Sequence, residues 1–299
     1  MSTLSASYRN ELKLSVRDRN PQIIFIIFLF LTSLSSLISW LTVRNVASIY
    51  QSIKRLGFTK ASNPFAGISS LYFVRNSVIY VILVGSLLAI ILGTQASIRD
   101  RKSLTSPLIK SRNVSLPSKY SGQLLAIFTI LFLALTIVTA AAYISIWLIQ
   151  GHPISSSPAL HLVAYAVTSW FLLIAIASFS FAYGFFTSAE ENGLLVPFIA
   201  WSVVTFITPL IATGIRPVAL LNPTPSLITD SGVPHALQLS LSPFIVMENF
   251  KSIANSLLGL DSSIKFSVTN TSYFIVFVLI GLITPFLVPR TAFGKNINV

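Results

Sequence analysis

Charge is the scarcest feature of this sequence of 299 residues. Only 9% of the residues are Asp, Glu, Lys or Arg, whereas about a quarter of a soluble protein is charged. Hydrophobic residues make up 54%, and the mean hydropathy is +0.80. So few charges cannot cover a water-exposed surface of this size, which excludes an ordinary soluble enzyme, a disordered chain and a solvated nucleic-acid-binding protein. The composition predicts a polytopic membrane protein.

Cysteine is absent, which excludes a disulfide framework, a thiolate metal site and a cysteine nucleophile. The sequence also has no G-x-x-x-x-G-K-[ST] phosphate loop, so we do not expect the chain itself to hydrolyse ATP or to act as an enzyme. None of the three histidines, His152, His161 and His235, has a second ligand at metal-binding spacing, and we expect no metal or cofactor in this chain.

Long runs without any charge mark the membrane spans. They cover 20–43, 76–98, 120–189, 192–215 and 266–289. One spanning helix needs about 20 apolar residues, so the 70-residue run holds two helices, separated near Gly151 and Pro153. Strands of a barrel are far shorter than these runs. The sequence therefore predicts an all-α integral membrane protein, a single domain over 1–299, with transmembrane helices at 22–43, 77–98, 122–149, 159–188, 193–214 and 271–289.

The interior of these predicted helices has no Asp, Glu, Lys or Arg, which argues against a proton pump or an ion-coupled transporter. Pro197 and Pro209 are expected to kink the fifth helix. Small residues favour close helix packing within the membrane, and they occur at Thr139, Ala140, Ala141, Ala142, Ala175, Ala177 and Ser178.

The distribution of Lys and Arg predicts the orientation. Segments 1–21, 99–121, 189–192 and 290–299 are short and carry 12 basic residues, whereas the longer segments on the other side carry eight. The positive-inside rule therefore places both termini in the cytoplasm. We expect the membrane to be the plasma membrane. The first apolar run is too long for a signal peptide and is interpreted as an anchor. The net charge of +12 then reflects topology and anionic lipids, with no nucleic-acid partner.

Three segments outside the spans have amphipathic patterns. In 1–21, Tyr8, Leu12 and Val16 share one helical face and basic residues share another, which predicts a helix at the cytoplasmic lipid interface; the alternative is a flank that only sets topology. Segment 99–121 has six basic residues and a helix start at Ser106-Pro107, so it predicts a second interfacial helix or, alternatively, a topogenic loop.

The third segment, 215–270, lies on the predicted outer side. A helix is expected to begin at Ser242-Pro243 and to lie at the interface or half-inserted, with Glu248, Lys251 and Asn255 on its polar face. Asn270 begins a glycosylation sequon, Asn-Thr-Ser.

These features together resemble the permease subunit of an ABC-2 type ABC transporter. YRNELKLSVRDRNPQII at 8–24 resembles the elbow helix of that family, and IRDRKSLTSPLIKSRNVSLPSKYSGQLLA at 98–126 resembles its basic cytoplasmic loop, although Asp100 replaces the usual Glu and the family's Gly-Thr pair is missing. FFTSAEENGLLVPFI at 185–199 resembles the turn between the fourth and fifth helices, and the outer helix at 243–258 resembles the re-entrant segment before the sixth.

The resemblance implies a separate ATPase subunit that binds ATP and Mg²⁺, a second permease chain in a homo- or heterodimer, and export of an unidentified substrate. It also implies that segment 99–119 is a coupling helix seated in the ATPase. The residues that it marks for this contact are Arg99, Asp100, Arg101, Lys102, Lys110 and Arg112, followed by Glu190 and Glu191.

Two other classes of function are compatible with the sequence. A non-transporting membrane anchor or scaffold subunit fits the uncharged interior equally well. A lipid-modifying membrane enzyme needs a polar site near one interface, for which Asp230, His235 and Glu248 are the candidates.

Overall fold

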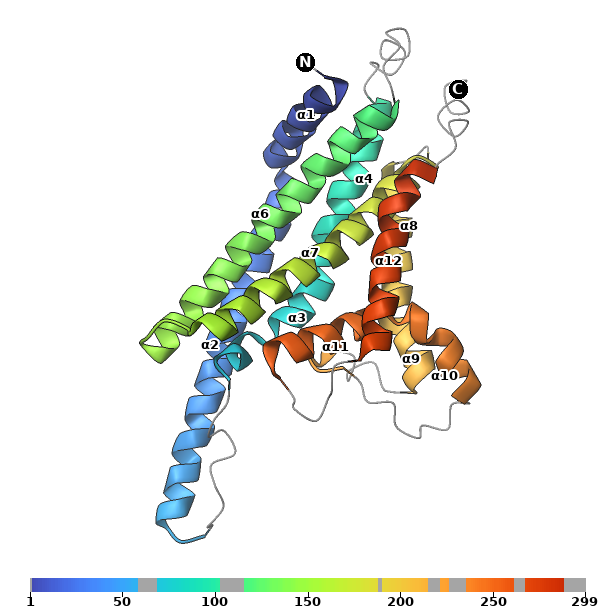
Figure 1. The fold of residues 1–299 in the computed structure, drawn as a ribbon. Coiled ribbons are helices and arrows are strands. Elements are labelled where there is room, and N and C mark those ends of the chain that lie inside the picture. The colour runs from blue at the N-terminus through green and yellow to red at the C-terminus, as the bar shows by residue number, and fades with distance from the viewer. Residues whose placement is uncertain are drawn as a thin grey trace.

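The computed structural model describes residues 2–58, 69–102, 116–187, 190–214, 221–225, 235–260 and 267–287 (Figure 1). The described residues form helices, turns and bends without any strand, and six helical stretches are long and apolar enough to cross a membrane. The prediction of an all-α, multi-pass membrane protein is therefore confirmed.

The spans follow one another along the chain, and two of them are interrupted by a π-helical turn. The second span starts with the short 3-10 helix η1 (Ser70–Val74), and the fifth ends in a left-handed Gly214. The spans are α2 (Arg19–Arg55), α3–η2–α4 (Ser77–Tyr80, Val81–Gly85, Ser86–Lys102), α6 (Leu116–Gln150), α7 (Ser156–Gly184), α8–η3–α9 (Glu190–Ser202, Val203–Ile207, Thr208–Thr213) and α12 (Val268–Leu287). The other helices are α1 (Thr3–Arg17), α10 (His235–Leu241), η5 (Ser242–Phe244) and α11 (Val246–Leu258).

Helix α7 is at the centre of the bundle, where it packs against α4, α6, α11 and α12. Helix α1 lies along α6, and the ends of α4 and α12 point to the same end of the molecule as α1 (Figure 1). We call this the α1 end. Helices α10 and α11 lie toward the opposite end (Figure 1).

Many buried side chains of the outer helices are polar, whereas many of their apolar side chains face outward. In α2, Thr32 and Ser36 are buried and donate to carbonyls one turn earlier, while Ile26 and Phe30 are exposed. Within a bilayer the surrounding solvent is hydrocarbon, so small polar residues make the helix contacts and large apolar residues face lipid.

Helix α2 is much longer than the predicted span at 22–43. Its 37 residues extend about 55 Å at 1.5 Å per residue, which exceeds the roughly 30 Å of a bilayer core. The sequence has no Pro or Gly between Pro21 and Gly57, and Gly57 has a φ of +78°. Charge at Arg44 therefore marks the limit of the apolar run, while the helix itself continues to Arg55.

Small residues bring α4, α7 and α12 into close contact. A Cβ on Gly93 would be 2.3 Å from the carbonyl oxygen of Ala177, and one on Gly281 would be 2.9 Å from Ala175. The predicted packing role of Ala175 and Ala177 is thus confirmed. Thr139 and Ala140, in contrast, line an open groove between α6 and α7.

The fifth span accommodates its two prolines differently. Helix α8 continues through Pro197, whereas the π-helical turn η3 ends just before Thr208 and Pro209. Thr208 donates its hydroxyl to the carbonyl of Val203 at 3.2 Å. Because proline has no N–H for the helix ladder, the change of helical pitch occurs where Pro209 interrupts that ladder.

Candidate functional site

The α1 end contains a three-residue polar cluster that joins α1 to α4. Arg99 donates to the Oε1 atom of Glu11 at 2.7 Å and to the hydroxyl of Ser15 at 3.0 Å. Ser15 in turn donates to the same carboxylate at 2.9 Å. Glu11 is 2% exposed and Arg99 is 26% exposed. A charge-assisted contact of this kind is stronger than a neutral hydrogen bond, so it fixes α1 at the point where α4 ends.

Helix α1 also packs tightly on α6. A Cβ on Gly122 would be 2.6 Å from the carbonyl oxygen of Leu4, so only glycine allows this approach. Tyr8 donates to Thr129 at 3.4 Å. The predicted elbow helix is confirmed as a helix, and its basic side chains, Arg9, Lys13 and Arg17, are exposed.

The residues marked for ATPase contact have different positions in the structure. Arg99 is engaged with α1, while Asp100, Arg101 and Lys102 form the last helical residues of α4. Lys110 and Arg112, and the helix expected to start at Ser106, lie outside the described residues. Glu190 and Glu191 are the first two residues of α8.

Two of these groups are on neighbouring helices at the α1 end. Helix α8 packs against α4, and a Cβ on Gly193 would be 2.5 Å from Cδ1 of Ile98. Segment 99–102 follows Ile98, and Glu190 and Glu191 precede Gly193 by two to three residues. The fold therefore brings the backbone of both groups to one place, although 88 residues separate Lys102 from Glu190.

Helix α11 differs from the expected interfacial helix. Glu248, Lys251 and Asn255, expected on the polar face of an interfacial or half-inserted helix, are all buried within the protein. Lys251 donates to Glu248 at 2.7 Å. Both faces of α11 are buried: Phe250 packs against Tyr165 of α7 and Phe274 of α12, whereas Lys251 lies toward η2 and η3. The spacing of three residues between opposite charges was the sequence signal for the pair.

A small cavity borders this ion pair. It is lined by Lys251, by Ile82 of the π-helical turn η2 and by Thr205 and Phe206 of η3. The hydroxyl of Thr205 is buried and makes no hydrogen bond within the described chain. π-Helical turns are frequent at functional sites, and nothing in the hydrophobic pattern of the sequence predicted either turn.

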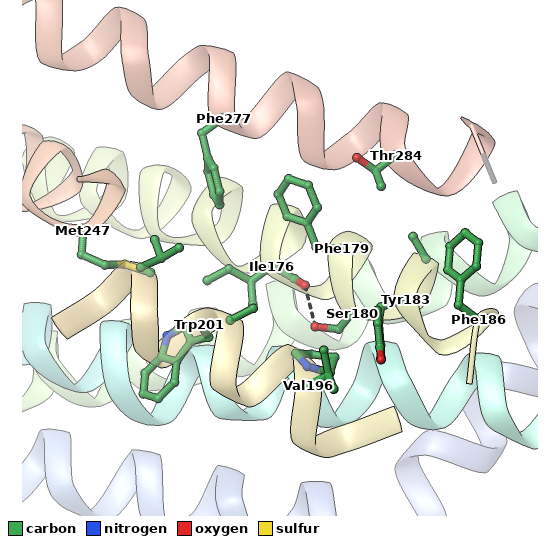
Figure 2. Close-up of a pocket in the computed structure, with 14 residues that line it drawn as sticks. Ile176, Phe179, Ser180, Tyr183, Phe186, Val196, Trp201, Met247, Phe277 and Thr284 are labelled. Carbon is green, nitrogen blue, oxygen red and sulfur yellow. Dashed lines mark hydrogen bonds between the residues drawn. The ribbon is translucent and has the colours of Figure 1, made fainter. Parts of the chain in front are cut away.

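A larger pocket opens between α7, α8–η3 and α12, with Met247 of α11 at one end (Figure 2). Its volume is about 440 Å³, within the range of roughly 300–1,000 Å³ for small-molecule sites. The hydroxyls of Ser180 and Thr284 donate to carbonyls of their own helices, at 2.9 and 2.7 Å. The pocket therefore presents an almost wholly apolar surface.

The described residues form neither a metal site nor the polar site that a lipid-modifying enzyme needs. No three His, Asp or Glu residues in the described part of the chain are arranged to hold a metal ion. Of the candidates for a lipid-modifying enzyme, Glu248 is paired with Lys251, Asp230 lies outside the described residues, and only the backbone of His235 is described.

Comparison with known proteins identified no relative of this chain. No protein-family model matches the chain, and no curated protein matches it. The function is therefore proposed from the chain's own sequence pattern and geometry.

Proposed function

We propose that this chain is the membrane-spanning permease subunit of an ABC-2 type ATP-binding-cassette exporter in the plasma membrane. A separate ATPase subunit binds ATP and Mg²⁺, and a second permease chain completes the transporter. Both termini of the chain are cytoplasmic. The α1 end is then the cytoplasmic end, where the ATPase docks.

The observation that carries this proposal is the junction of three elements at the α1 end. Segment 99–102 ends α4, Glu190 and Glu191 begin α8, and the two helices are in contact at Ile98 and Gly193. A partner that binds both segments therefore acts on two transmembrane helices together. Because Glu11 and Arg99 are in contact, a partner that moves α4 also moves α1.

We assign two roles to the basic residues of this end. Arg99 is a positioning residue, because its guanidinium is used by Glu11 and Ser15 within the chain. Arg101 and Lys102, two and three residues further along α4, are the residues proposed to contact the ATPase. Docking through basic side chains predicts an acidic or polar groove on the partner.

Charge reversal tests this division. The complex is purified from its native membrane through a tag on this chain, and its composition and ATP hydrolysis are measured for an R101E/K102E variant. We expect loss of the ATPase subunit, or loss of most of the hydrolysis. The matched control is K54E/R55E, which reverses two adjacent basic residues at the other end of the molecule, in the last turn of α2.

Two results would contradict the proposal. An R101E/K102E complex with unchanged composition and hydrolysis would show that this segment does not couple the two subunits. A wild-type complex that contains no ATPase would instead support the non-transporting anchor or scaffold.

A further inference from the structure

The pocket between α7, α8–η3 and α12 has a definite direction relative to the membrane. Tyr183 and Thr284 lie at one end, close to the α1-end termini of α7 and α12, while Trp201 and Met247 lie toward the other end (Figure 2). Along α8 and η3 its lining extends from residue 196 to residue 204, which corresponds to about 12 Å. The pocket therefore runs along the helices, from one membrane boundary toward the interior.

The walls of the pocket continue directly into the lipid-facing surface. Ile199 of α8 and Ile280 and Ile283 of α12 are about half exposed and point away from the bundle. Inside the pocket the Ser180 and Thr284 hydroxyls are already used by their own helices. The lining also includes Trp201, whose Nε1 is buried without an acceptor in the described chain. A ligand with several polar groups would therefore lose most of its hydrogen bonds on entry, whereas a hydrocarbon chain would lose none.

An empty pocket of this kind is unfavourable within a bilayer. Its lining, which includes Phe179, Phe277 and Trp201, would forgo dispersion contacts on one side. The nearest material is the hydrocarbon of the bilayer, which lies parallel to the pocket. One leaflet is about 15 Å of the roughly 30 Å core, so most of an acyl chain fits the length of the lining.

We propose that this pocket binds one acyl chain of a phospholipid from the leaflet at the α1 end. The glycerol and headgroup lie beyond Tyr183 and Thr284, whose hydroxyls suit the membrane boundary. The chain end reaches Met247 on α11. The inference is independent of the proposed transport function, because it requires neither nucleotide nor an ATPase.

Contact of a lipid with Met247 distinguishes a chain bound in the pocket from lipid that only surrounds the protein. Its side chain is only 2% exposed, and α11 is not one of the six spans. Lipids that merely surround the protein touch Ile199, Ile280 and Ile283, but they do not reach Met247. Only a chain inserted into the pocket does so.

Photo-reactive phosphatidylcholine tests the occupancy. The full-length protein is reconstituted in phospholipid nanodiscs with a small fraction of lipid that carries a diazirine either at the end of one acyl chain or near the glycerol. Cross-linked residues are identified by mass spectrometry. We expect the chain-end probe to label Met247 and Trp201, and the probe near the glycerol to label Tyr183.

Two variants on the same helix provide the comparison. Ala200→Phe fills the pocket and should abolish labelling of Met247, whereas Ile199→Phe adds volume on the outer face of α8 and should leave it intact. Wild-type protein in which Met247 is not labelled would overturn the proposal, because no acyl chain would then reach the inner end of the pocket. Labelling of Met247 that persists in a folded Ala200→Phe variant would overturn it as well.

Discussion

Glu11 and Arg99, 88 residues apart in the sequence, form an ion pair of 2.7 Å that attaches α1 to the end of α4. The carboxylate is buried and the guanidinium is partly exposed. The pair lies immediately before the last three residues of α4, 100–102, so the position of this helix end depends on the docking of α1.

The two partners of this ion pair should not be equivalent in mutagenesis. Arg99→Met removes the guanidinium that lies 2.7 Å from the buried Glu11 carboxylate, and removal of one partner of such a pair typically costs about 3 kcal/mol of unfolding free energy. Glu11→Gln leaves a partly exposed guanidinium that still has an amide acceptor, so we expect about 1 kcal/mol. Thermal unfolding of the detergent-solubilised protein, followed by circular dichroism, measures the difference. Equal destabilisation by the two substitutions would contradict the unequal burial of the two groups.

The buried pair on α11 should show strong coupling between its members. Lys251→Met alone removes the ammonium group that donates to the buried Glu248 carboxylate, and we expect a loss of about 3–5 kcal/mol. The double variant Glu248→Leu/Lys251→Met should lose less than Lys251→Met, because no buried charge remains. The same unfolding measurement gives the coupling energy through a double-mutant cycle. Additive effects would mean that the two charges do not interact.

Close packing between α4 and α7 should make Gly93 intolerant of a single methyl group. In Gly93→Ala the new Cβ would be 2.3 Å from the Ala177 carbonyl oxygen, so the two helix backbones must separate. Overpacking of this kind costs roughly 1–3 kcal/mol. The control is Leu148→Phe on the exposed face of α6, where added volume meets no neighbour. A Gly93→Ala protein as stable as the control would contradict the observed helix spacing.

The absence of cysteine makes the orientation directly measurable, because every introduced cysteine is unique. Asn10→Cys lies on the exposed side of α1, and His152→Cys lies in the exposed turn between α6 and α7. If the α1 end is cytoplasmic, a membrane-impermeant maleimide labels only His152→Cys in intact cells. Asn10→Cys reacts after the membrane is made permeable. The reverse pattern would refute the proposed orientation.

The membrane spans were predictable because lipid imposes a simple length rule on apolar runs. The interruption at Gly151 and Pro153 correctly divided the longest run into α6 and α7. The end of α2 was not predictable from charge, because a helix ends at a breaker such as Gly57 and not where the lipid ends.

The candidate site was only partly predictable. A helix with one polar face has the same sequence pattern whether that face meets water or, as in α11, a buried partner; only the fold decides that Glu248 and Lys251 are inside. The Glu11–Arg99 contact also depends on tertiary structure. Neither residue has an oppositely charged residue three or four positions away in the sequence, so no local pattern marks its partner. The acyl-chain pocket has no local pattern at all, because its walls come from four helices.

The central claim, that the end of α4 docks on an ATPase, is tested most directly by site-specific photo-cross-linking in living cells. A photo-reactive amino acid replaces Lys102 at the end of α4 or, as the control, the exposed Leu148 at the opposite end of α6. We predict that position 102, and not position 148, cross-links to a protein with an ATP-binding-cassette phosphate loop. A cross-link from position 102 to a protein without such a loop, or none in cells where the chain is assembled, would contradict the claim.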